Sequence, residues 1–349
     1  MVRTDQTAAT GGLSHDLRAD LQRLSSRFFA DAPAVDTAES VPDDHLRSLA
    51  NARLYGLFAP ETEGGLGLGY PGMCSAVEEL ASGCLASTFL WSQHFRFLGA
   101  MLGPSSPAAL RQKYLHGAIT GQVKGGVALT GLLSGPARLM ARPVPEGWRL
   151  EGEAPWVSGW GVVDVIVVLA RGPDDTVVTL LVDAKPQPGL SVTPLRLVAL
   201  NASRTVRARF GGVVVRPDMV IGEQDYETAR AQSERLRLNG SFALGLVRRC
   251  CSLMGPSPLD QELADCRAAL DGADETGLPA ARAWACELAA RASARLAVSR
   301  GSRSALVGDV AERLSREAAF LLVFGSRPAI KESLLARLSA GPRPAAHHR

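Results

Sequence analysis

Apolar residues in the first third of the chain recur every three to four positions, which is the spacing of one face of an α-helix. In residues 15–30 the residues at this spacing are Leu17, Leu21, Leu24, Phe28 and Phe29. A second helix is predicted to begin near Asp43, whose carboxylate suits the positively polarised start of a helix. Residues 73–102 are apolar nearly all round, so we predict a long helix buried within a bundle. A short helix at 108–117 follows.

At about Gly125 the pattern changes to short runs rich in Val, Leu and Thr, such as VDVIVVLA (163–170) and TVVTLLVDA (176–184). Turn sequences containing Gly, Pro and Asp separate these runs, which is typical of β-strands joined by tight turns. Seven or so strands with no helices between them predict an antiparallel barrel or sandwich of about 100 residues, because a parallel βαβ unit needs intervening helices.

After Gly222 the apolar period is helical again. One predicted helix carries Leu236, Val247 and Met254 on one face and ends at Gly255. Further helices are predicted from residue 259, from Pro279 (a residue tolerated in a first turn), and on both sides of a Gly-Ser-Arg-Pro turn at 325–328.

The order of elements is helices, β unit, helices, with no internal repeat, so we predict an α+β multidomain protein. The predicted parts are a disordered leader at 1–14, an N-terminal helical domain at 15–123, a middle β domain at 124–226, a C-terminal helical domain at 227–340 and a disordered tail at 341–349.

Composition adds little to this picture except by exclusion. The 349 residues are 46% hydrophobic and 21% charged, with a net charge of +3, which argues against a nucleic-acid binder. Residues 228–349 hold 18 Lys and Arg against 12 Asp and Glu. This basic excess fits either the phosphates of a cofactor or substrate, or solvated helix faces.

The six cysteines have no metal-type CxxC spacing; they are Cys74, Cys84, Cys250, Cys251, Cys266 and Cys286. The chain begins with no apolar signal segment, and no apolar run approaches the roughly 18 residues that span a bilayer. We therefore expect free thiols, a cytoplasmic protein and no membrane span.

Three motifs that suggest chemistry have simpler interpretations. The loop EGGLGLGYPG (63–72) lacks a GxGxxG register inside a βαβ unit, so we interpret it as a tight connection between helices. GLLSG (131–135) is not a GxSxG nucleophile turn. His94 and His116 have no carboxylate or thiol at ligand or triad spacing, and we interpret both as packed or surface histidines.

Six segments, in order along the chain, resemble segments of the acyl-CoA dehydrogenase family. They are LYGLFAPETEGGLGLG (54–69), EELASGCLASTFLWSQH (78–94), ALTGLLSG (128–135), GWRLEGEAPWVSGWGVVDVIVVLA (147–170), FGGVVVRPDMVIG (210–222) and AERLSREAAFLLVFGSRPAIKESLLAR (311–337). Each match is short, but the order and spacing are those of the family from about residue 15 to 340.

The resemblance implies a flavoenzyme with a β unit between two helical bundles. FAD would lie between the β unit and the C-terminal helices, with an acyl thioester on the flavin's other face. In α,β-dehydrogenation a carboxylate takes the α-proton while hydride leaves the β-carbon for the flavin. By position in the matching motifs, Thr130 would bond the edge of the flavin ring, Trp156 would pack against it and Ser158 would bond near N5. Arg300 and Arg303 are candidates for its phosphates.

The sequence also departs from the family. Phe324 stands where the common subgroup has its glutamate base, so Phe324 and Gly325 are expected to shape the substrate pocket. A second subgroup carries its base on the first C-terminal helix, and Glu234 lies beside that position, although the counted slot holds Arg235. Glu234 is therefore the candidate base, with a solvated helix-start residue as the alternative. The family's Arg and Phe-Gly, which meet the FAD diphosphate, are replaced at 251–255.

Three functions follow as hypotheses. The first is an FAD-dependent acyl-thioester dehydrogenase, acting on a CoA or carrier-protein thioester and passing electrons to a flavoprotein or to oxygen. The second is a flavin-dependent monooxygenase or oxidase on the same fold, which needs no α-proton base. The third is a non-catalytic subunit paired with a complete homologue. The resemblance also implies a homodimer, a homotetramer or a heteromer with a paralogue.

Overall fold

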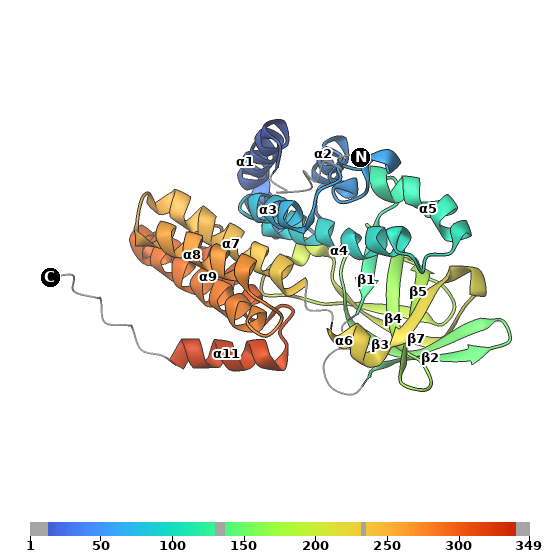
Figure 1. Cartoon of the computed structure of the whole chain (residues 1–349). Helices are drawn as coiled ribbons and strands as arrows, with labels where there is room; N and C mark the ends of the chain where they lie inside the picture. Colours follow the sequence, from blue (N-terminus) through green and yellow to red (C-terminus); the bar gives the residue numbers. More distant parts are fainter. Residues whose placement is uncertain (1–12, 130–136, 232–234, 340–349) are drawn as a thin grey trace, which may run out of the picture.

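The computed structural model of the chain describes residues 13–129, 137–231 and 235–339. In Figure 1 the N-terminal helices lie above, the β-sheet lies below them on the right, and the C-terminal helices form a stack on the left. The predicted leader and tail fall almost entirely outside the described residues.

The N-terminal helices are α1 (His15–Thr37), α2 (Asp43–Asn51), α3 (Tyr70–Ala81), α4 (Leu85–Leu102) and α5 (Ala108–Thr120). The prediction of one long helix over 73–102 is wrong, because the chain breaks between α3 and α4. At the break, a Cβ on Gly83 would lie 2.4 Å from the carbonyl oxygen of Ser25 in α1. Close approach of α1 therefore leaves room only for glycine.

Described residues of the middle region form one eight-stranded sheet with the order β6-β7-β3-β2-β4-β5-β8, and β1 pairs with β4. The strands are β1 (Gly125–Ala128), β2 (Leu139–Val144), β3 (Gly147–Val157), β4 (Val165–Arg171), β5 (Thr176–Asp183), β6 (Leu190–Pro194), β7 (Val206–Val215) and β8 (Val220–Asp225). Most neighbours are antiparallel, as predicted, but β1 and the start of β2 run parallel to β4, so the sheet is mixed.

Strand β4 is buried on both faces, which explains its unbroken apolar sequence. Val165, Val167 and Leu169 pack with residues of α4 and α5. Ile166 and Val168 face the opposite way, into the core enclosed by the other strands. The N-terminal helices therefore cover one face of the sheet, as Figure 1 shows.

The C-terminal region contains α6 (Tyr226–Ala231), α7 (Arg235–Met254), α8 (Pro258–Gly272), α9 (Leu278–Arg300), α10 (Val310–Val323) and α11 (Pro328–Ser339). Helix α9 is lined with buried alanines and leucines, and it packs against α7, α10 and α11. Helix α7 packs closely on α3, where a Cβ on Gly245 would lie 2.5 Å from the Glu78 carbonyl oxygen. The bundle and the N-terminal helices consequently share one core.

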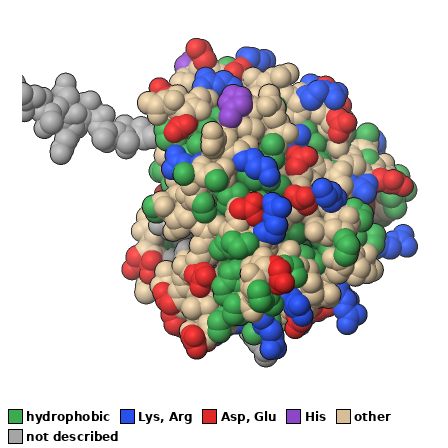
Figure 2. All heavy atoms as spheres, turned by 90° about the vertical axis from the view of Figure 1, so that its right-hand side faces the viewer, with side chains coloured by type: hydrophobic (Ala, Val, Ile, Leu, Met, Phe, Trp, Pro, Cys, Tyr) green, Lys and Arg blue, Asp and Glu red, His purple; other side chains and the backbone are tan. Residues whose placement is uncertain are grey.

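The distribution of surface charge and the state of the cysteines match what the composition led us to expect. Figure 2 shows basic and acidic side chains interspersed on the face at the right of Figure 1, with no field of a single sign there. All six cysteines are free and buried. Among the described helices, none has both the length and the apolar character needed to cross a membrane.

Candidate functional site

An exposed tryptophan stands at the end of β3. The pairing of β3 with β7 shifts register between Ala154 and Val157, which leaves Pro155 and Trp156 on a β-bulge. A bulge re-aims a side chain out of the regular alternation. Trp156 is accordingly 49% exposed, whereas Ala154 and Val157 of the same strand are buried. Its indole offers a flat aromatic surface near the end of β3.

Directly after this bulge lies a chain of three hydroxyl groups, which we call the hydroxyl chain. The Oγ of Ser158 lies 2.7 Å from Oγ1 of Thr205, which lies 2.9 Å from Oγ of Ser203. The backbone N–H of Gly159 donates to the Ser203 carbonyl at 2.8 Å. Ser158, the residue expected near the flavin N5, thus has its hydroxyl bonded to the segment that precedes β7.

That segment, residues 197–205, has an unusual backbone. Leu200 and Arg204 both have positive φ, at 63° and 49°, a conformation that costs a non-glycine residue about 1 kcal/mol or more. Surrounding contacts hold it: the Val41 N–H donates to the Ala202 carbonyl at 2.9 Å, and Arg204 Nε donates to the Trp160 carbonyl at 2.7 Å. Segment 197–205 therefore connects the N-terminal helices with the end of β3.

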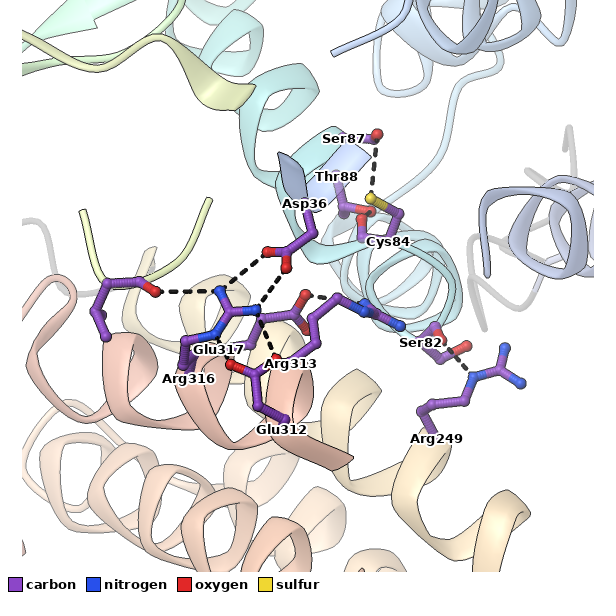
Figure 3. A network of polar contacts seen from close by, with 11 residues as sticks. Asp36, Ser82, Cys84, Ser87, Thr88, Arg249, Glu312, Arg313, Arg316 and Glu317 are labelled. Atoms are coloured by element: carbon purple, nitrogen blue, oxygen red, sulfur yellow. Dashed lines mark hydrogen bonds and ion pairs between the residues drawn. The ribbon is translucent and has the colours of Figure 1, made fainter. Parts of the chain in front are cut away.

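Arg316 of α10 also reaches this segment (Figure 3). Its guanidinium donates to the Val198 carbonyl at 3.2 Å and to the Asp36 carboxylate of α1 at 3.1 Å, and it pairs with Glu312 one turn earlier. Hydrogen bonds that Arg316 donates to the Glu312 and Asp36 carboxylates raise the pKa of Arg316. One side chain thereby joins α1, α10 and segment 197–205.

Next to it lies a buried ion pair between Arg313 and Glu317, with a distance of 3.0 Å from Nη1 to Oε1. Burial raises the pKa of Glu317, and the adjacent Arg313 opposes that rise. The two residues lie one helical turn apart on α10 and face the N-terminal helices in Figure 3, and the Arg313 guanidinium carbon lies 5.9 Å from the centre of the Phe29 ring of α1.

The turn after α10 is packed with aromatic rings. The Phe324 ring lies 5.1 Å from that of Phe89, 6.0 Å from that of Phe242 and 5.5 Å from that of Phe320, measured between centroids. These four rings come from α4, α7 and α10, and we call them the phenylalanine cluster. None of them can accept a proton, so the position that the family motif gives to a base is an apolar wall.

Arg282 of α9 binds the backbone of the turn that follows α10. It is 1% exposed, and its Nη2 donates to the Phe324 carbonyl at 3.5 Å while Nη1 contacts the Cys286 thiol. The Cys286 thiol donates to the Leu321 carbonyl at 3.0 Å. These carbonyls end α10, where a cation is favourable. Gly325 follows with φ of 60°, the left-handed conformation that glycine adopts freely.

The two candidate phosphate arginines differ. Arg300 forms two bonds to Asp309, of 2.9 and 2.7 Å, and Asp309 in turn caps α10 by accepting from the Ala311 N–H. Its guanidinium is therefore engaged in the structure of the chain itself. Arg303 lies on an exposed 3₁₀ turn directly after α9. The phosphate role remains a prediction for both, and Arg303 is the freer of the two to meet an anion.

Thr130 and Glu234, the predicted ring-edge and base residues, lie outside the described residues. Sequence reasoning did not identify Ser203, Thr205, Phe89 or Phe242. The first two carry no simple signal, because Ser203 ends a 3₁₀ turn (Asn201–Ser203) and Arg204 has positive φ, so the strand rule for residues two apart does not apply. For the two phenylalanines no local signal exists, because they meet Phe324 from separate helices.

Comparison with known proteins finds acyl-CoA dehydrogenases similar to this chain in sequence and in fold. Residues 14–122 match the sequence profile described as "Acyl-CoA dehydrogenase, N-terminal domain". The chain is similar to benzylmalonyl-CoA dehydrogenase of Aromatoleum aromaticum, with 25% identity over 231 residues, covering 64% of this chain and 61% of the relative. It spans less than two thirds of the length of this and other curated relatives that it matches.

The fold is similar to that of butyryl-CoA dehydrogenase from Megasphaera elsdenii, with a TM-score of 0.77 and 16% identity, over 94% of this chain and 99% of that chain. It is also similar to the dibenzothiophene monooxygenase TdsC from Paenibacillus sp. A11-2, with a TM-score of 0.75 and 18% identity, over 92% and 95% of the two chains. TdsC has also been solved with FMN and indole. The predicted architecture of helices, sheet and helices is confirmed.

Proposed function

The chain belongs to the acyl-CoA dehydrogenase family, and from this premise we propose that it is a flavin-dependent oxidoreductase acting on an acyl thioester of CoA or a carrier protein. The observation that carries the proposal is that an exposed indole, Trp156, and the hydrogen-bonded hydroxyl of Ser158 both lie at the C-terminal end of β3. An indole face suits stacking on a flavin ring, and a hydroxyl suits a ring nitrogen.

The residues present fit the ring end of a flavin better than its tail. Trp156 and Ser158 would hold the ring, together with Thr130 by its place in the motif. For the phosphates this chain offers Arg303, since Arg300 is bound to Asp309. The cofactor we propose is FAD; FMN, with which TdsC has been solved, is the alternative that needs fewer contacts to the tail.

When bound, the flavin supplies the acceptor for hydride leaving the β-carbon of the thioester. The chain must then remove the α-proton with a base, and Phe324 cannot do so. We assign this role to Glu234, which precedes α7 by one residue. Phe324, with the rest of the phenylalanine cluster, would form an apolar wall that excludes water from the acyl group.

The first test is the visible absorption spectrum of the purified protein. Flavin bands are expected, and a colourless protein that gains flavin only with a co-expressed homologue would instead support a non-catalytic subunit. Anaerobic addition of acyl-CoA should then bleach the flavin. The Glu234→Gln variant should lose bleaching by about 10²–10⁴-fold in rate. Glu275→Gln, at an exposed turn, is the matched control. Unchanged bleaching in Glu234→Gln would remove Glu234 as base.

A second function is favoured by the phenylalanine cluster itself and by the fold shared with TdsC. A flavin-dependent monooxygenase or oxidase activates oxygen at reduced flavin. This reaction needs no α-proton base, so it is compatible with an aromatic wall at the position of the base. Supplying the protein with chemically reduced flavin and oxygen, and analysing products by mass spectrometry, distinguishes the two functions. An oxygenated product without anaerobic bleaching by acyl-CoA supports this second function.

A further inference from the structure

The hydroxyl chain has three hydroxyl protons but only two hydrogen bonds between its members. Ser203 is 0% exposed, Thr205 4% and Ser158 6%. Two contacts join the three oxygens, and they use two of the three hydroxyl protons. Within the described part of the chain, no other hydrogen-bond partner is found for these side-chain oxygens. The third proton therefore needs an acceptor outside the hydroxyl chain.

The position of Ser203 fixes the direction of the bonds. Its hydroxyl is the innermost of the three, and a buried donor without an acceptor is costly. Ser203 therefore donates to Thr205. Since Thr205 then has its own proton to place, it donates to Ser158. The proton that remains belongs to Ser158, which is the member nearest the exposed Trp156, two residues earlier in the chain.

Resting on the function proposed above, we infer that Thr205, supported by Ser203, is a positioning residue that presents the Ser158 hydroxyl as a hydrogen-bond donor to the flavin ring. The N5 atom of an oxidised flavin is a hydrogen-bond acceptor, whereas in the reduced flavin N5 carries a proton. A hydroxyl held as a donor therefore favours the oxidised form. Thr205 would set the flavin's potential through Ser158, without being in contact with the ring.

The Thr205→Val variant removes both links with little change in volume. Its dissociation constant for oxidised flavin is expected to rise about tenfold, with that for reduced flavin changed less. A tenfold loss of affinity for oxidised flavin alone raises the two-electron midpoint potential of the bound flavin by about 30 mV. Ser203→Ala should shift the potential in the same direction by less, because Ser203 acts only through Thr205. Thr205→Ser retains a hydroxyl and should restore the wild-type potential.

The control is Ser25→Ala, which removes another buried hydroxyl, one that bonds to Glu79 and Ser82. It should destabilise the fold without changing the potential. If wild type binds flavin and Thr205→Val has an unchanged dissociation constant and potential, this inference alone is overturned. If wild type binds no flavin, both the inference and the proposed function are overturned. Should Thr205→Val not fold, the same two measurements on Ser203→Ala decide.

Discussion

At the scale of single residues, the turn after α10 differs from the resembling family motif in the side chain that it carries. Gly325 takes the left-handed conformation, and Arg282 donates to the Phe324 carbonyl. Where the resembling motif has a carboxylate, Phe324 completes a cluster of rings. That substitution was visible in the sequence. Phe320 lies one helical turn earlier and is within reach of Phe324 by spacing alone, but the rings of Phe89 and Phe242 were not visible, because they come from α4 and α7.

Phe324→Ala is expected to lower the free energy of unfolding by about 1–3 kcal/mol, because the half-buried ring contacts three others. Urea denaturation measures this. Phe58→Ala is the matched control, since Phe58 is also half-buried but has one ring contact, to Phe95 at 6.0 Å. Equal losses in both variants would show that the phenylalanine cluster contributes no stability of its own.

His94 makes the stability of the protein depend on pH. Its Nε2 donates to the Ala118 carbonyl and its Nδ1 accepts from the Gly125 N–H, so it is neutral, and burial lowers its pKa to about 3. The unfolded chain, with a pKa near 6.5, binds the proton more readily. The free energy of unfolding should therefore fall by up to about 1.4 kcal/mol per unit as pH drops from 6.5 toward 3, and be unaffected above 6.5.

Urea titrations of wild type and His94→Gln between pH 5 and 7.5 test this. The variant, which cannot titrate at position 94, should show the shallower pH dependence. Some slope will remain in it, because burial also lowers the pKa of His45. Parallel curves for the two proteins would assign the pH dependence to other groups.

At the scale of elements, local pattern was sufficient where apolar residues recur regularly or form a short unbroken run. The helix that ends before Gly255 was predicted from its apolar period, and the strands rich in valine from their short apolar runs between turn sequences. The break between α3 and α4 was not predicted, since the apolar pattern continues through it. Its cause is the approach of α1 to Gly83, which is a contact between residues far apart in the sequence. The parallel pairing of β1 with β4 was missed for the same reason.

Two glycine substitutions test this account of the break. Gly83→Ala places a Cβ 2.4 Å from the Ser25 carbonyl oxygen and should cost about 1–3 kcal/mol of stability. Gly99→Ala lies within α4 with no atom within 4 Å of its new Cβ, and should stabilise by about 0.5–1 kcal/mol. Thermal unfolding of both variants gives the comparison. A stabilising Gly83→Ala would contradict the close approach of α1.

At the scale of the whole molecule, one guanidinium joins three parts of the structure. Arg316 binds Asp36 of α1, Glu312 of its own helix and the Val198 carbonyl of the segment before β7. Arg316 lies in segment 311–337, one of the six that resemble the family. Its partners could not be predicted, because Asp36 lies 280 residues away in the sequence. The hydroxyl chain lies on the same segment, so the junction and the candidate flavin site share one support.

Arg316→Met should lower the free energy of unfolding by about 1–3 kcal/mol, because it leaves the Asp36 carboxylate, mostly buried, without its cation. It should also speed amide hydrogen exchange in residues 197–205. Arg111→Met is the control: the Arg111–Glu63 pair is exposed and 3.8 Å long, so its loss should cost less than about 1 kcal/mol. Unchanged exchange in segment 197–205 would show that Arg316 does not hold it.

The buried cysteines allow the opening of the helical regions to be measured by chemical labelling. All six lie in or beside helices α3, α4, α7, α8 and α9, and none lies in the sheet. Burial raises the pKa of Cys74 to about 11 and that of Cys266 to about 12, so neither thiol is ionised at neutral pH. An alkylating reagent should therefore label the native protein slowly, at the rate at which helices open. The number of labels per molecule, followed over time by mass spectrometry, would give the rate at which the helical bundles open. Opening of the sheet would add no label, because the sheet contains no cysteine.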